Sequence, residues 1–144
     1  MKYIFTLVII GSGILAAACK KDAVAIDASK LCAVENEKKY VVTTGYLDDR
    51  GSIFCSNIGG GSVRCMLDVT AKPGDKKVFG ADIVQGSGSS EIEELPSGYK
   101  KSDIKIHDNS GNIINLSDKV NLTGDMSIAP DGSVCFMEVD KIEK

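Results

Sequence analysis

The sequence predicts an all-β fold, a small barrel of about five to seven antiparallel strands with a short N-terminal helix. Three observations lead to this prediction. Segments rich in β-branched residues follow one another from Tyr40 to the end of the chain. Clusters of Gly, Asp, Asn and Pro separate these segments, as turns require. Apolar and polar side chains alternate along the last two segments, which is typical of strands with one buried face.

The helix is expected first, over residues 29–39. Ser29 can serve as its N-cap, and Leu31, Cys32 and Val34 give it a thin apolar stripe. The strands are expected in the order 40–47, 52–56, 63–70, 78–84, 104–107, 112–116, 120–128 and 133–142.

Two glycines, Gly45 and Gly124, lie within predicted strands that have a similar sequence pattern. Thr44-Gly45 before a turn and a second strand is echoed by Thr123-Gly124 before the final turn and strand. A strand residue without a side chain permits the sharp coiling that a small barrel needs. We therefore expect Gly45 and Gly124 to lie at corners of the barrel.

Four cysteines, Cys32, Cys55, Cys65 and Cys135, fall within the predicted domain and allow three pairings. Cys55 and Cys65 are equally far from Gly60, so a hairpin that turns there would place them opposite each other. This spacing favours a Cys55–Cys65 bridge and leaves Cys32 for Cys135. Four buried free thiols are the alternative.

The sequence offers no recognisable catalytic or metal-binding signature, so we expect a non-enzymatic protein without a cofactor. The cysteine spacings contain no Cys-x-x-Cys clip of the kind that binds zinc. His107 is the single histidine and precedes a predicted turn. The acidic pairs Asp48-Asp49 and Glu93-Glu94 lie at a turn and beside a loop, where charge ordinarily serves solubility.

The N-terminus has the layout of an export signal. Lys2 precedes an apolar run that continues to small residues before Cys19, and the run is too short and too interrupted by glycine for a membrane-spanning helix. The stretch Leu15-Ala16-Ala17-Ala18-Cys19 resembles a bacterial lipobox, although the family prefers Leu where this chain has Ala16. Ordinary signal-peptide cleavage after Ala18 is the alternative.

The lipobox resemblance implies that Cys19 carries lipid, palmitate among its acyl chains, and becomes the first residue of the mature protein. Two or more acyl chains would hold the protein stably on a membrane. Lys20 stands where an Asp would signal inner-membrane retention, so the expected location is the outer membrane of a bacterial cell envelope. The expected organisation is a signal peptide over 1–18, a lipidated tether over 19–28 and a barrel domain over 29–144.

The chain also resembles the OB-fold lipoproteins of the tRNA-anticodon-like, nucleic-acid-binding group. The resemblance is carried by residues 28–40, by the strand ending Val42-Thr43-Thr44-Gly45-Tyr46, and by the closing pair 119–124 and 139–143. It covers about half of the mature chain and implies an OB-like barrel. OB barrels bind oligonucleotides, oligosaccharides and proteins alike, so this resemblance implies a fold more than a ligand.

These observations together predict a binding or structural module tethered to the outer membrane, with an envelope protein or a glycan as its partner. The alternative is an OB-fold binder of oligosaccharide or single-stranded nucleic acid, for which Tyr40, Tyr46, Phe54 and Phe136 could form a stacking platform. A net charge of −3 disfavours nucleic acid. Other candidate contact surfaces are the loop 86–94 and the hairpin tip 59–62.

Overall fold

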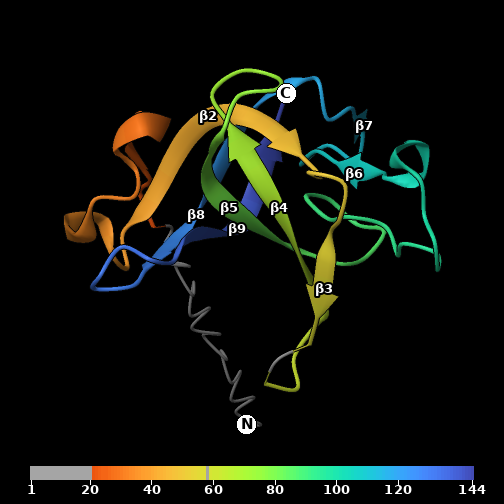
Figure 1. Ribbon diagram of the computed structural model, residues 1–144, viewed down its shortest axis with the longest axis horizontal. Helices are drawn as coiled ribbons and strands as arrows, with labels where there is room; N and C mark the ends of the chain where they lie inside the picture. The colour runs from red at the N-terminus through yellow and green to blue at the C-terminus, as the bar shows by residue number, and fades with distance from the viewer. Residues whose placement is uncertain (1–20, 58) are drawn as a thin grey trace, which may run out of the picture.

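The computed structural model describes residues 21–57 and 59–144. Five strands form a closed barrel: β2 (Tyr40–Asp48), β4 (Arg64–Thr70), β5 (Lys77–Val84), β8 (Lys119–Ile128) and β9 (Cys135–Glu143). Around the barrel their order is β2-β8-β9-β5-β4, and pairing between the C-terminal end of β2 and β4 completes the ring (Figure 1). Most neighbours are antiparallel, but β5 and β9 run parallel. The fold is therefore all-β and closed, and the parallel contact within the ring was not predicted from the sequence.

Two shorter strands extend this ring and two others form a separate sheet. β1 (Val24–Ala25) pairs in parallel with the start of β2, and β3 (Phe54–Ser56) pairs with β4 at the edge of the sheet. β6 (Ile106–His107) and β7 (Ile113–Ile114) form a separate hairpin. Residues 24–26, expected within the tether, are thus already hydrogen-bonded to β2, with the Ile26 N–H donating to the carbonyl of Val42.

Alternating side chains of the barrel strands fill the interior, as the periodicity predicts. The buried apolar residues on these strands are Val41, Leu47, Cys65, Leu67, Val69, Phe79, Ala81, Ile83, Val120, Leu122, Met126, Ile128, Met137, Val139 and Ile142. Removal of this much apolar surface from water is the main favourable contribution to the free energy of folding. Among the described residues, none forms a helix long and apolar enough to cross a membrane.

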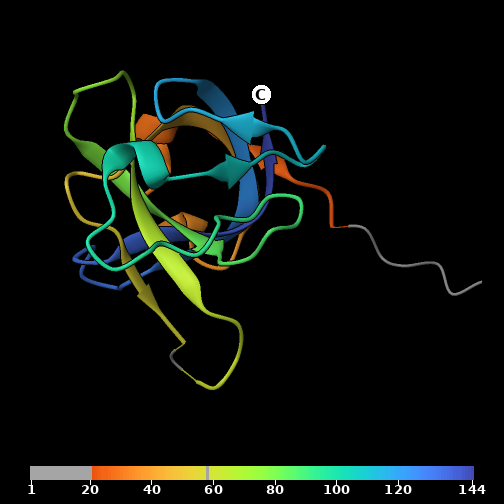
Figure 2. The same ribbon diagram turned by 90° about the vertical axis from the view of Figure 1, so that its right-hand side faces the viewer.

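The long connection between β5 and β8 covers one end of the barrel. Figure 2 shows the β6–β7 hairpin and its neighbouring loops in front of the ring of strands. Ile92, Ile106 and Ile114 from this connection are buried. The connection is also bonded to the last strand, because the side-chain hydroxyl of Ser90 accepts the Ile142 N–H at 3.0 Å. The connection is part of the fold and closes the core at this end.

The predicted N-terminal helix is wrong. Residues 28–36 form two short 3₁₀ helices, η1 (Ala28–Lys30) and η2 (Val34–Asn36), and Ala33 between them is extended. The side-chain amide of Asn36 donates to the carbonyls of Lys30 and Leu31, which gives the backbone an alternative to helical hydrogen bonds. Asp27, rather than Ser29, caps the first turn. A third 3₁₀ helix, η3 (Lys101–Asp103), lies in the long connection.

Candidate functional site

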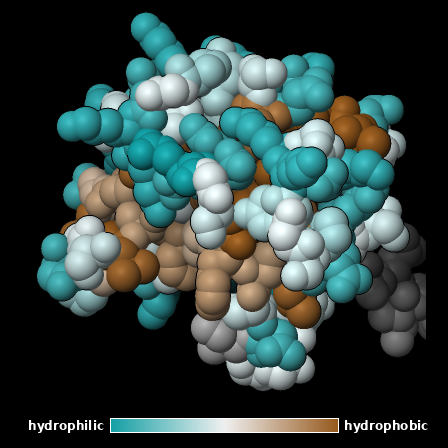
Figure 3. Space-filling model, turned by 45° about the vertical axis from the view of Figure 1, so that its right-hand side comes forward, coloured by the Kyte–Doolittle hydropathy of each residue, from teal (hydrophilic) through white to brown (hydrophobic). Residues whose placement is uncertain are grey.

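Three apolar side chains meet on the outer surface of the barrel, across β3, β4, β5 and β9. Phe54 is 68 % exposed, and Met66 and Phe136 are half-buried. We call these three residues the apolar strip. A band of tan and brown surface crosses the lower half of the face in Figure 3. Exposed apolar side chains that lie next to one another often mark a binding surface, so the strip is the first candidate for one.

Strand register explains why these side chains meet. Phe54 on β3 pairs with Met66 on β4, and Gly80 on β5 pairs with Phe136 on β9. The side chains of Phe54, Met66 and Phe136 point outward because their chain neighbours point toward the interior. Met66 and Phe136 lie on diagonal positions of this lattice and approach each other over Gly80.

Gly80 permits this approach. A Cβ built on Gly80 would stand 2.7 Å from the sulfur of Met66 and 3.2 Å from the Cβ of Phe136. Any side chain here would therefore occupy the space that Met66 now fills. The glycine that interrupts β5 is what lets a methionine and a phenylalanine come together on this face.

A hollow lies on either side of the contact between Met66 and Phe136. One has a volume of about 570 Å³, and Phe54, Ser62, Arg64 and Glu138 contribute to its lining. The other has a volume of about 470 Å³ and lies between β5 and the β8–β9 turn, beside the Cys32–Cys135 pair. An elongated ligand that crossed the apolar strip would fill both hollows.

Charged groups border the apolar strip at the first hollow. The Arg64 guanidinium donates through Nε to Asp82 Oδ2 at 2.7 Å and through a terminal nitrogen to the Asp82 carbonyl at 2.8 Å. Asp82 also lies directly opposite Glu138 in the β5–β9 pair. Within the described part of the chain, the Glu138 carboxylate has no hydrogen-bond or ion-pair partner. Arg64 thus pairs with Asp82, and the Glu138 carboxylate beside it is exposed and has no cation within the described residues.

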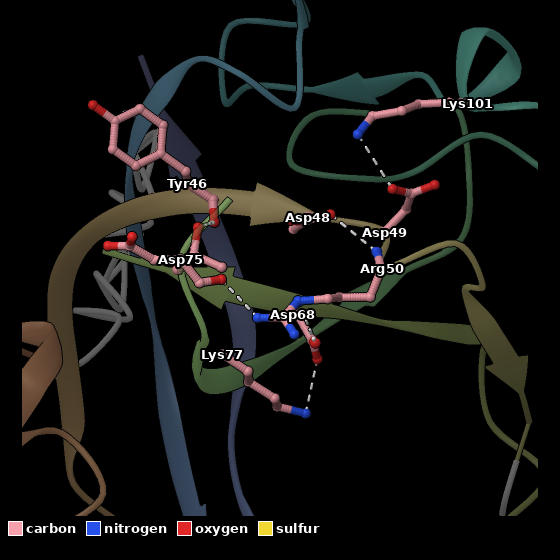
Figure 4. A network of polar contacts seen from close by, with 9 residues as sticks. Tyr46, Asp48, Asp49, Arg50, Asp68, Asp75, Lys77 and Lys101 are labelled. Carbon is pink, nitrogen blue, oxygen red and sulfur yellow. Dashed lines mark hydrogen bonds and ion pairs between the residues drawn. The ribbon is translucent and has the colours of Figure 1, made fainter. Parts of the chain in front are cut away.

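A polar network closes the opposite border. Asp68, opposite Gly80 in the register, forms an ion pair with the Lys77 ammonium at 2.9 Å and lies 3.5 Å from Nε of Arg50. Figure 4 shows Asp68 beside the side chains of Arg50 and Lys77. Arg50 also donates to the carbonyl of Asp75 at 2.7 Å. Arg50 and Lys77 already have anionic or carbonyl partners, which weakens the attraction of these two cations for a polyanion.

The structure brings together only two of the four aromatic residues proposed as a platform. Phe54 and Phe136 belong to the apolar strip, whereas Tyr40 pairs with Asp125 across β2 and β8, and the Lys21 ammonium lies 5.5 Å from its ring centroid. Burial raises the pKa of the Tyr40 phenol. Tyr46 lines a separate hollow of about 360 Å³ near Lys101 and Leu116. Tyr40 and Tyr46 thus do not line the hollow that Phe54 and Phe136 share.

The predicted disulfides are both present. Cys55 and Cys65 face each other across β3 and β4, with their Cα atoms 4.0 Å apart, and join the apolar strip's edge strand to the barrel. Cys32 and Cys135 join the N-terminal segment to the start of β9, with Cα atoms 5.7 Å apart. Each bridge fixes a segment that carries or flanks the apolar strip.

Of the two other proposed contact surfaces, the hairpin tip 59–62 is exposed and the loop 86–94 is held by hydrogen bonds. The tip 59–62 is exposed, and Ser62 lines the first hollow. The loop 86–94 is tied down, since the Glu91 carboxylate accepts the Gly88 N–H at 2.6 Å and Ile92 bridges to Gln85 and Ile106. Glu93 accepts from His107 Nε2 at 3.0 Å. This hydrogen bond raises the pKa of His107 and lowers that of Glu93.

Sequence reasoning missed Met66, Arg64, Asp82 and Glu138 as site residues. Their outward positions on strands were the available signal, and Arg64 and Asp68 do point outward as the alternation predicts.

Within residues 21–57 and 59–144, no group of three or more His, Cys, Asp or Glu side chains could hold a metal ion. Cys19, the predicted lipid-bearing residue, lies outside the described residues.

No protein-family model, curated protein or solved structure matches this chain.

Proposed function

We propose that this protein is a bacterial envelope lipoprotein and that its barrel is a non-enzymatic binding module, tethered to the outer membrane through Cys19. The observation that carries the binding role is the exposed apolar strip on a barrel fixed by two disulfides. Disulfides persist in oxidising compartments such as the periplasm, in agreement with an exported chain. The export signal and the lipobox-like stretch before Cys19 support the tether.

If the barrel is an OB fold, its expected ligand-binding face is the face that carries the apolar strip. In chain order the five barrel strands are β2, β4, β5, β8 and β9, and the second and third of these carry Met66 and Gly80. In OB barrels the face of the second and third strands, with the loops after the first and fourth strands, binds ligands. Phe54 lies in the connection after β2, and Phe136 follows the connection after β8.

The tether can be tested with a Cys19→Ala variant in cells. The unaltered protein should fractionate with the outer membrane, and its intact mass should show diacylglyceryl on Cys19 with residues 1–18 removed. The variant should lose the lipid mass. A Gly61→Ala variant is the control, because it changes a residue within the fold at little cost in stability and should keep the lipid. An unmodified Cys19 in the membrane fraction would contradict the proposal.

The exposed strip also favours a second candidate, an OB-fold binder of oligosaccharide or single-stranded nucleic acid. Phe54 offers a solvent-exposed ring of the kind on which sugars and bases stack. Fluorescence polarisation with labelled single-stranded oligonucleotides at low salt and with labelled glycans tests this candidate. Binding that is lost in a Phe54→Ser variant supports it, and absence of binding to every probe removes it.

A further inference from the structure

The chemistry of the apolar strip and its border is that of a protein–protein interface. Phenylalanine, methionine and arginine are among the residues enriched at the centres of such interfaces, and Phe54, Met66, Phe136 and Arg64 adjoin one another here. The flexible thioether of Met66 can adapt its shape to an apolar side chain of a partner. The charged border matches the polar rim that surrounds such centres.

The negative charge of Glu138 favours a partner that carries a positive charge. Arg64 is engaged by Asp82, and Glu138 opposite Asp82 is left without a cation within the described chain. Burial of Glu138 beneath an apolar partner would leave an uncompensated charge, which is costly. A partner that supplies a cation at this position would remove that cost, whereas a polyanion would meet two carboxylates.

From this arrangement we infer that the apolar strip binds a partner protein through a segment that presents apolar side chains to Phe54, Met66 and Phe136 and a Lys or Arg to Glu138. The inference rests on the proposed binding role and gives its ligand class. A second copy of this chain is a poorer occupant, because it would bring the same unpaired carboxylate and a net charge of −3.

Phage display of random peptides of about twelve residues against the oxidised full-length protein provides defined probes without a known partner. Enriched peptides should combine apolar residues with a Lys or Arg. A synthetic peptide of the enriched sequence should bind Glu138→Lys at least about tenfold more weakly than the unaltered protein. Replacement of the peptide's basic residue by Glu should restore binding to Glu138→Lys.

Glu94→Lys is the matched control, since Glu94 is an exposed glutamate on the loop 86–94, which lies outside the apolar strip, and this change should leave the affinity unaltered. Phe54→Ser should abolish binding without altering the unfolding midpoint, because Phe54 is largely exposed. Three results would each overturn the inference: no enrichment, enriched peptides without a basic residue, or equal loss of binding in Glu94→Lys. A glycan or oligonucleotide that binds through Phe54 would overturn the inference and leave the binding role intact.

Discussion

Gly124 on β8 lies against the backbone of Glu138 on β9 so closely that a Cβ built on Gly124 would overlap the Glu138 carbonyl oxygen. The register between β8 and β9 shifts between Thr123 and Gly124, so the strands bend where this glycine allows them to approach.

A Gly124→Ala substitution should therefore be strongly destabilising. The obstructing atom is backbone and cannot rotate away, so β8 and β9 would have to separate at a cost of about 3 kcal/mol. Urea unfolding measures this change in the free energy of unfolding. Gly61→Ala is the matched control, because a Cβ there meets nothing within 4 Å, and it should change stability by less than about 0.5 kcal/mol. Equal stabilities of the two variants would contradict the role assigned to Gly124.

Local features of the fold were predictable from the sequence. The alternation of apolar residues placed the strands and their buried faces, and the turn centred on Gly60 placed Cys55 opposite Cys65. Both signals act within one hairpin or one strand. The parallel contact between β5 and β9 joins segments more than fifty residues apart, and alternation alone specifies a strand's faces but not its neighbour.

The candidate site was predictable only in part, for the same reason. Phe54 and Phe136 could be named because exposed aromatic residues are typical of binding surfaces. Their meeting depends on Gly80 and Met66, neither of which carries a distinctive signal in sequence. Tyr46 is also aromatic but lies beside another hollow, because it pairs with Thr70, at the opposite end of β4 from Met66.

Gly80→Ala should alter the apolar strip with little effect on stability. The added methyl group would meet the sulfur of Met66, the movable end of a flexible side chain, and would lie 3.2 Å from the Cβ of Phe136, so the cost should be about 1 kcal/mol. Displacement of Met66 from its position beside Gly80 and Phe136 should shift the resonance of its labelled methyl group in an NMR spectrum. The methyl resonance of buried Met126 serves as the internal reference. A change of Met126 without any change of Met66 would be inconsistent with the contact described here.

The two disulfides should differ in their contribution to stability. Cys32 and Cys135 are 103 residues apart in sequence, whereas Cys55 and Cys65 are 10 apart. Since a crosslink restricts the unfolded chain more when it closes a longer loop, removal of the first should cost about 5 kcal/mol and removal of the second about 3 kcal/mol. Paired Cys→Ala variants, unfolded in urea without reductant, test this order. A larger loss of stability on removal of Cys55–Cys65 would show that native contacts at Cys55 contribute more than the difference in loop length.

His107 should make part of the stability depend on pH. Its Nε2 lies 3.0 Å from a Glu93 oxygen and its Nδ1 lies 3.2 Å from the Gly111 carbonyl, and only the protonated ring can donate to both acceptors. The Glu93 hydrogen bond accordingly raises the pKa of His107 above 6.5, its ordinary value. A raised pKa in the folded state means that this contribution is complete below 6.5 and is lost as the pH rises through the folded-state value. Urea midpoints measured across this range should fall with increasing pH, and a Glu93→Gln variant should show a flatter profile and a lower NMR-derived pKa for His107. A pKa for His107 that is unchanged by Glu93→Gln would show that the carboxylate is not its partner in solution.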